Sequence, residues 1–425
     1  ELPPGQYGIQ SDIVLSYNSK RVDGILNWRS SGWAGLGWNV STIDIVRTNI
    51  RYKWAGNYDW LTYDNEFRLV LNGASYRLEP GAAAQDAGRY FAIGAPDLYV
   101  ERINDCTVGD CNDHNGGSPE NKTREYWVVK TSDGTSYQLG YTHNSEQVLY
   151  RTENGETWDH AYSGSAKHYT AYRWRVDQVT DVYGHEVMAY EYQEHKTKYG
   201  CDTPEKCSGC SNGQRDIASY LHRIHYNQDV PGNWLTTVEF SGITRSPTCG
   251  DPANDILPIP PGDDGSPIFE TQSRLDSIRV LWEGAVVKEY VLDYETSSIF
   301  GPGVVFLLKS IQPYGVGGVG TGLSLPATTF GYYKPEDYPA GQYPFPNKDK
   351  CYDCTNPWDQ ERFEYERLKW VDNGYGGRTE FLYENDGAAR GDWWQGFYNY
   401  RVREKRVDDG VTGAPARKIY YDYDN

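Results

Sequence analysis

The sequence predicts an all-β protein, built from successive antiparallel hairpins that form one large curved sheet. Three observations predict this fold: apolar and polar residues alternate along most of the chain, turn signals separate the alternating runs, and helical periodicity is almost absent. The 425 residues include 45 glycines, 22 prolines and 15% aromatic residues. Turn-forming residues between aromatic-rich strands are what such a sheet requires.

Pairs of alternating runs flank turn signals along the whole chain. The clearest is Asn72-Gly73, a dipeptide typical of two-residue hairpin turns. The paired runs are 68–71 with 74–78 around Asn72-Gly73, 126–131 with 135–141 around Asp133-Gly134, 174–182 with 186–192 around Tyr183-Gly184, 275–282 with 285–294 around Glu283-Gly284, and 364–371 with 378–383 around 373–377. One exception is 217–224, whose spacing fits two helical turns.

Polar segments at 103–123, 200–215 and 246–268 interrupt the alternation, and we interpret them as surface loops. Strands resume on both sides of each loop, so we expect a continuous sheet rather than separate domains. Within it we distinguish an amino-terminal β region at 1–102, hairpins with cysteine-rich loops at 103–265, a further β region at 266–345, and a final region at 346–425.

The charge balance excludes several classes of protein. Lys and Arg number 41 against 59 Asp and Glu, a net charge of −18. Nucleic acids and anionic membrane surfaces both attract cationic proteins, so we expect neither as a partner. No run of about 18 apolar residues predicts a membrane-spanning helix, and we expect no membrane insertion. Glu1-Leu2-Pro3-Pro4 fits a mature or processed start.

The eight cysteines favour an oxidising compartment, since their number is even and they lie in polar segments. They are Cys106, Cys111, Cys201, Cys207, Cys210, Cys249, Cys351 and Cys354. We expect disulfides that pin the loops, and a secreted, extracellular or cell-surface protein. A zinc site built from the pairs 207/210 and 351/354 is one alternative, and free thiols are another. Asn39 and Asn121 begin glycosylation sequons.

Motifs associated with catalysis lack the context that their chemistry needs. The GxSxG pattern at 209–213 follows a cysteine-rich loop instead of a buried strand, and the GxGxxG pattern at 315–320 precedes Pro326 instead of a helix. His222 and His225, three apart on a strand, point to opposite faces and form no metal pair. We therefore expect no enzyme, no catalytic residue and no metal site.

Oxygen-rich loops at 110–116 and 263–265 are the candidates for calcium, but they lack regular ligand spacing, so we expect no cofactor. Paired carboxylates for glycoside hydrolysis cannot be recognised from sequence among 59 acids. Trp28, Trp33 and Trp38 cluster, as do Trp393 and Trp394. We interpret both clusters as packing aromatics, and sugar-stacking platforms are the alternative.

Several segments resemble the Rhs/YD-repeat family. Asp12–Gly24, which contains LSYNS, and Ser31–Asn39, which reads SGWAGLGWN, are similar to the opening of these proteins. Trp174–Tyr192 looks like a degenerate YD unit, and Leu325–Phe330 is similar to a short segment that precedes the repeats. The chain ends at Tyr420–Asn425, YYDYDN, where regular repeats are expected to begin, so 346–425 is the expected start of degenerate repeats.

The resemblance implies a fold and a function. Family members wind hairpins into a hollow shell, which encloses a toxic domain in polymorphic toxins and in B/C components of toxin complexes. By this resemblance the chain is the amino-terminal part of a shell, a non-enzymatic scaffold, container or assembling surface structure. An adhesin or glycan-binding protein is the alternative, followed by a carbohydrate-active enzyme. Because unpaired sheet edges invite pairing, we expect partners among copies of the chain or the remaining YD-repeat polypeptide, with glycans under the alternative.

Overall fold

The elements that this computed structural model describes are all strands, as the alternation predicts. The structure describes residues 5, 13–19, 22, 32–48, 50–55, 58–63, 66–71, 73–83, 86–104, 123–151, 168–198, 214–244, 273–297, 305–334, 337, 366–385, 400–411 and 415–423. The predicted helical turns at 217–224 are wrong, because this segment lies within β15 (Gln214–Val230). Pairing with strands on both of its sides overrides the local spacing there.

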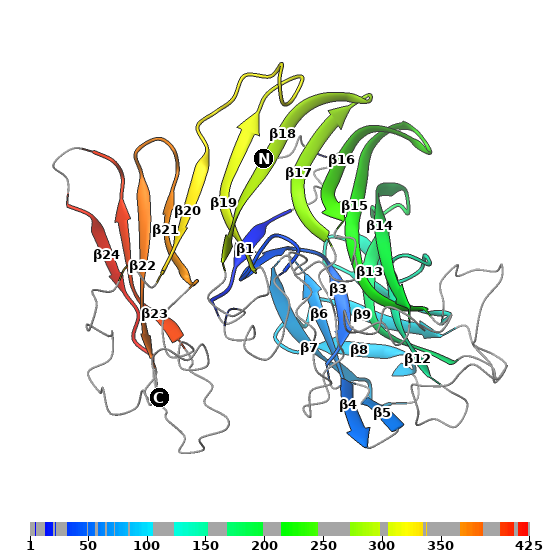
Figure 1. The fold of residues 1–425 in the computed structure, drawn as a ribbon. Helices are drawn as coiled ribbons and strands as arrows, with labels where there is room; N and C mark the ends of the chain where they lie inside the picture. The colour runs from blue at the N-terminus through cyan, green and yellow to red at the C-terminus, as the bar shows by residue number, and fades with distance from the viewer. Residues whose placement is uncertain are drawn as a thin grey trace, which may run out of the picture.

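One part of the molecule is a closed ring of antiparallel strands (Figure 1). Its hydrogen-bonded order is β13, β3, β6, β7, β8, β9, β10, β11 and back to β13. The bounds are β3 (Asp44–Arg47), β6 (Phe67–Leu71), β7 (Ala74–Pro80), β8 (Arg89–Ala92), β9 (Tyr99–Asn104), β10 (Glu125–Lys130), β11 (Ser136–Leu139) and β13 (His168–Thr180), with β12 (Glu146–Arg151) alongside β13.

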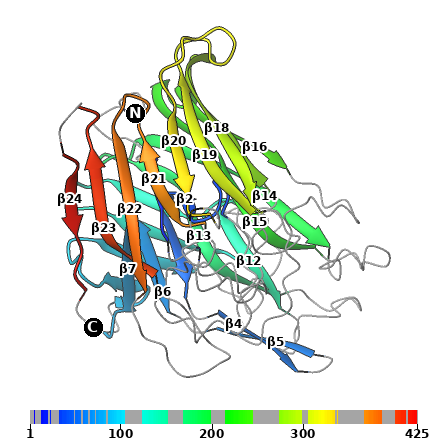
Figure 2. The ribbon, with the colours of Figure 1, turned by 60° about the vertical axis from the view of Figure 1, so that its left-hand side comes forward.

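The other part is a curved sheet in which each strand from β13 to β24 pairs with the next (Figure 2). Its remaining strands are β14 (Glu186–Lys198), β16 (Asn233–Thr244), β17 (Ser273–Trp282), β18 (Ala285–Ser297), β19 (Val305–Tyr314), β20 (Thr328–Tyr332), β21 (Leu368–Asp372), β22 (Arg378–Asn385), β23 (Tyr400–Asp408) and β24 (Arg417–Tyr420). The predicted hairpins and the predicted curved sheet are confirmed.

Strand β13 belongs to both parts and is the point where the ring and the sheet branch. Residues 173–175 pair with β3, which closes the ring, whereas residues 178–180 pair with β14, which starts the sheet. On its other edge β13 pairs with β12 and then with β11. A single strand therefore fixes the orientation of the ring relative to the sheet.

Aromatic rings fill the interior of the ring of strands. Phe67, Tyr90, Trp127 and Trp174 are buried and pack edge-on or tilted, with centroids 4.9 to 5.8 Å apart. These arrangements place the positive edge of one ring against the negative face of another. The ring of strands is therefore a packed core.

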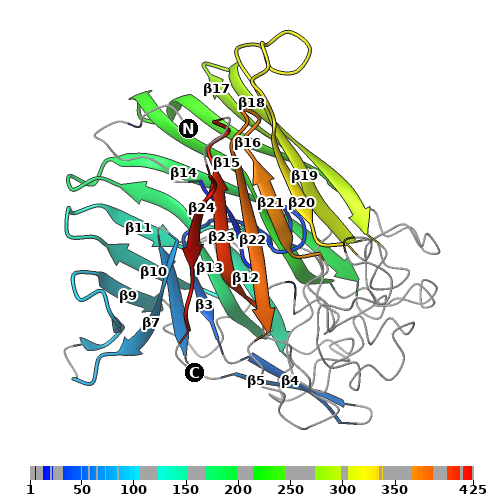
Figure 3. The ribbon, with the colours of Figure 1, turned by 90° about the vertical axis from the view of Figure 1, so that its left-hand side faces the viewer.

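The segment that resembles the family opening lies inside the curve of the sheet (Figures 1 and 3). It contains β1 (Leu15–Tyr17) paired with β2 (Trp38–Val40). The Leu36 amide donates to the Phe306 carbonyl at 2.8 Å, and the Leu275 amide donates to the Trp33 carbonyl at 2.9 Å. Residues near the amino terminus thus cover the apolar face of strands far along the chain. A separate hairpin joins β4 (Ile50–Ala55) and β5 (Tyr58–Tyr63).

A row of alternating charges crosses β14 to β18, formed by residues that are partners in register: Glu191, Arg223, Glu239, Arg279 and Glu289. Arg223 lies 3.6 Å from Glu191 and 3.0 Å from Glu239, and Arg279 lies 2.8 Å from Glu289. We call this row the charge ladder. A slip of one residue between any two strands would break it, so the ladder favours the observed register.

Candidate functional site

Many residues singled out in the sequence lie outside the described part of the chain. These are all eight cysteines, Asn121, the 209–213 motif, the two candidate calcium loops, Trp28, Trp393 and Trp394. The disulfides and their zinc and free-thiol alternatives therefore stay predictions. Asn39, the other sequon asparagine, lies within β2.

The glycine motif at 315–320 forms a loop between β19 and β20, as predicted. Gly317, Gly318 and Gly320 have φ between 67° and 91°, which glycine adopts without strain. No helix follows the motif, so it cannot orient a dinucleotide pyrophosphate as that motif does elsewhere. Instead, the Val319 amide donates to Glu289 of the charge ladder at 2.8 Å.

Both histidines lie on β15. The His225 ring is 3.0 Å from the Thr237 hydroxyl and 3.1 Å from Glu191, and it stacks on Trp234. No group of His, Cys, Asp or Glu that could hold a metal ion occurs among the described residues. No helix in that part of the chain is long and apolar enough to cross a membrane.

Two tryptophans of the family-like segment are packing residues. Trp33 packs against Tyr220 and Phe240 with centroids 5.3 and 5.9 Å away. Trp38 packs against Phe330 at 4.8 Å, and its indole N–H donates to the Tyr332 hydroxyl at 2.9 Å. Trp38 is 6% exposed, so its ring is not accessible for sugar stacking.

The strongest concentration of buried charge lies on the branch strand β13. Arg173 donates through Nε to Asp44 of β3 at 2.8 Å, which joins the strands that close the ring. Arg175 is buried beside it, with Nη1 3.3 Å from the Ser219 hydroxyl and its guanidinium over the Tyr192 ring. Burial, together with the charge of Arg173, lowers the pKa of Arg175 to about 10.

Asp177 is the most perturbed acid of this cluster. It lies at an irregularity where Leu139 pairs with Val176 but Gln138 pairs with Gln178, so Asp177 is the extra residue on β13. Its Oδ2 accepts hydrogen bonds from the Ser145 hydroxyl and from the backbone amides of 141 and 142, at 2.8, 2.5 and 3.1 Å. Burial nevertheless raises its pKa to about 7.

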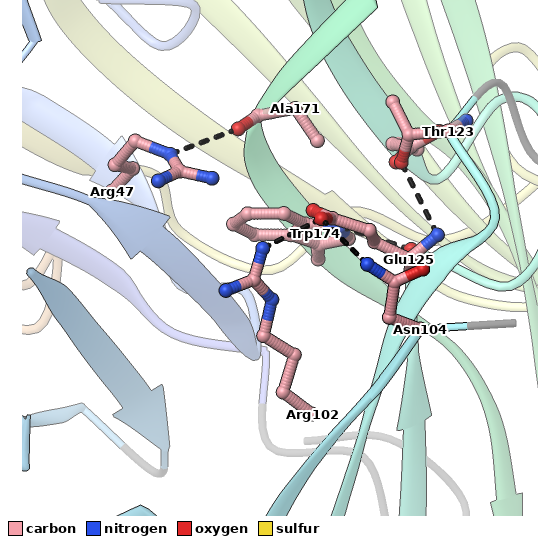
Figure 4. A network of polar contacts seen from close by, with 8 residues as sticks. Arg47, Arg102, Asn104, Thr123, Glu125, Ala171 and Trp174 are labelled. Carbon is pink, nitrogen blue, oxygen red and sulfur yellow. Dashed lines mark hydrogen bonds and ion pairs between the residues drawn. The ribbon is translucent and has the colours of Figure 1, made fainter. Parts of the chain in front are cut away.

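A polar network lies at one end of the ring (Figure 4). Arg102 contacts Glu125 at 2.6 Å, and Asn104 contacts the same carboxylate at 3.4 Å. The Trp174 indole N–H donates to the Glu125 carbonyl at 3.1 Å. Arg47 of β3 donates to the Ala171 carbonyl of β13 at 3.1 Å. The network ties β9 and β10 to the branch strand.

Beside this network is a pocket of about 290 Å³. Its lining comprises Pro80, Gly81, Asp86, Ala87, Gly88, Arg89, Tyr90, Arg102 and Asn104. The Arg89 guanidinium lies 3.7 Å from the centre of the Tyr99 ring. Asp86 is the one carboxylate among the lining residues, so the pair of acids that glycoside hydrolysis requires is missing from this lining.

Neither Asp177 nor the charge ladder was anticipated from the sequence. Both depend on which residues of separate strands become neighbours. The alternation of apolar and polar residues does not determine that register. Each strand of the ladder contributes a single charged residue, such as Glu191 or Arg223, so no run of charges in the sequence indicated it.

No family model matches this sequence, and no curated protein sequence matches it. Solved structures do show similarity. The TcdB2-TccC3-Cdc42 complex matches at 15% identity and a TM-score of 0.44, over 79% of this chain and 16% of that chain. The Photorhabdus luminescens Tc holotoxin pore matches at 14% identity and 0.42, over 77% and 15%.

The N-terminal domain of the effector protein SpvB from Salmonella typhimurium strain LT2 matches at 15% identity and a TM-score of 0.41, over 74% of this chain and 97% of that one. The chain thus spans about one sixth of the toxin-complex chains. These are similarities of fold alone. They concern the path of the chain, and we carry over no activity or partner from them.

Proposed function

We propose that this chain is a non-enzymatic structural protein of the extracellular space or the cell surface, a segment of an Rhs/YD-repeat-type β shell that acts as a scaffold. The observation that carries the proposal is the unbroken sheet from β13 to β24, in which residues 13–19 and 32–40 cover the apolar face between β15 and β21. A sheet whose apolar face is packed in this way keeps its curvature, as a scaffold requires. Cysteines in polar loops and a net charge of −18 suit an extracellular setting.

The edge of this sheet is where we propose that a shell continues. Within the described residues β24 pairs with β23 and has no strand on its other side. The Tyr421 amide donates to the Arg403 carbonyl at 2.9 Å. Because amides alternate in direction along a strand, the Tyr420 amide faces outward. A neighbouring polypeptide, either another copy or a continuing YD-repeat chain, would add its strand here.

The test is light scattering during size-exclusion chromatography over a range of protein concentrations. We expect the wild-type protein to assemble above its 48.3 kDa mass. Tyr420→Pro removes the outward amide and should leave a monomer, whereas Tyr420→Ala keeps that amide and should still assemble. A wild-type protein that stays monomeric throughout, or assembly unaffected by the proline, would disprove the edge-pairing model.

A further inference from the structure

Every second connection of the sheet lies on the same rim, because successive strands run in opposite directions. The turns after β13, β15, β17, β19, β21 and β23 therefore share one rim, along the upper side of Figure 1. We call this edge the turn rim. It consists of residues 181–185, 229–232, 282–284, 315–327, 373–377 and 409–411.

Each turn of this rim presents at least one exposed apolar or aromatic side chain. Leu323 is 89% exposed and Tyr183 is 81% exposed, more than any other large hydrophobic side chain of the described residues. The complete set is Val182, Tyr183, Val230, Trp282, Val316, Val319, Leu323, Leu325, Tyr375 and Val411. Single exposed hydrophobic residues are ordinary, but a row that recurs at every turn marks an interaction surface.

These side chains are not needed to form the turns. Gly184 and Gly284 adopt φ of 84° and 80° and supply the reversal of the chain. The Asp181 carboxylate accepts from the amides of 183 and 185, both at 2.9 Å. Polar residues at the tips would serve the fold equally well, so the apolar side chains call for another explanation.

The charges beside the turn rim indicate which kind of partner the rim can bind. Asp229, Glu283, Asp408 and Asp409 are exposed beside the apolar tips. The basic side chains at the turns after β13 and β21 already have acidic partners, since His185 lies 3.1 Å from Asp181 and Arg378 lies 3.3 Å from Asp372. The rim is thus apolar with an acidic border. A second copy or an anionic membrane would meet repulsion there.

We propose that the turn rim docks a partner protein whose contact surface is apolar and bordered by lysine and arginine. This surface is separate from the β24 edge, and the proposal stands whether or not that edge pairs. Aromatic and leucine side chains would enter apolar hollows of the partner, and the carboxylates would set its orientation and association rate.

The probe is a fluorescent amphipathic peptide of leucine and lysine, with a leucine–glutamate peptide as its counterpart and anisotropy as the readout. We expect the lysine peptide to bind at low salt, more weakly at 1 M salt, and the glutamate peptide not to bind. The combined variant Tyr183→Ser, Trp282→Ser, Leu323→Ser and Tyr375→Ser should weaken binding by at least about tenfold. Hydroxyl-radical footprinting should show protection of these side chains in the wild type.

The control replaces exposed hydrophobic residues away from the rim: Val14→Ser, Phe91→Ser and Ile93→Ser. It should bind like the wild type. Glu283→Gln with Asp409→Asn tests the charge without touching an apolar tip, and should weaken binding and its salt dependence. Equal binding by the rim variant and the control overturns the proposal. So does rim-dependent binding to phosphatidylcholine vesicles, which would assign the rim to lipid, or rim-dependent self-association, which would assign it to a second copy.

Discussion

Replacing the buried carboxylic acid on the branch strand should change how stability depends on pH. Asp177 is 5% exposed, and burial raises its pKa from an ordinary 3.8 to about 7. The folded protein therefore retains a proton that the unfolded chain releases between these values, so stability falls as pH rises through this window. A difference of roughly three pKa units corresponds to at most about 4 kcal/mol. Asp177→Asn keeps a neutral acceptor for the three donors and removes this loss.

The assay is urea denaturation of wild type and Asp177→Asn from pH 4 to pH 8. We expect the variant to gain stability relative to the wild type by a few kcal/mol across this range, with the gain complete near pH 8. Asp133→Asn is the matched control. Hydrogen bonds from Thr131 and Thr135 lower the pKa of Asp133 below its ordinary 3.8, so the difference between the wild type and this variant should stay nearly constant from pH 4 to pH 8. A difference between wild type and Asp177→Asn that stays constant with pH would show that the three donors outweigh burial.

Two further predictions concern the sheet and the ring. Arg279→Gln removes a cation with carboxylates on both sides and should cost about 1 kcal/mol in low salt and less in 1 M salt, whereas Lys309→Gln, from a fully exposed pair with Asp293, should cost clearly less. Equal costs in denaturation would contradict a cooperative ladder. Gly140 and Gly73 share a φ of 76°, but only at Gly140 would a Cβ meet the Trp174 side chain. Gly73→Ala should therefore cost about 1 kcal/mol and Gly140→Ala about 3 kcal/mol or more, and similar melting temperatures would refute this packing argument.

The fold was predictable as far as local signals determine it. Gly73 and the dipeptide Glu283-Gly284 adopt the positive φ that two-residue hairpins demand, and alternation on both sides identified the strands. The helical interpretation of 217–224 failed because its periodicity was read without its neighbours. Leu221 and Ile224 are both buried within one strand, because the register with β14 shifts between them.

The branch at β13 could not be predicted from the sequence. Nothing local distinguishes 173–175 from 178–180, yet the first stretch closes the ring onto β3 and the second starts the sheet with β14. The pairing with β3 joins residues about 130 positions apart, and such long-range pairing depends on the packed core. Asp177 acquires its raised pKa through the irregularity at this same place, so its chemistry was equally hidden.

Because the strands alternate in direction, the connections between them fall on two rims, and we assign different roles to these rims. On the turn rim the strands are joined by short connections, such as Glu283-Gly284, whose geometry is fixed by glycine. On the opposite rim the connections are long, with 245–272 between β16 and β17 and 333–367 between β20 and β21. Long insertions cost a sheet little when both ends are already held by paired strands. The short tips of the turn rim, by contrast, hold Tyr183 and Trp282 close to paired strands, and the longer 315–327 loop carries Leu323. Tips held close to paired strands lose little entropy on binding, which is why we assign the docking role to the turn rim.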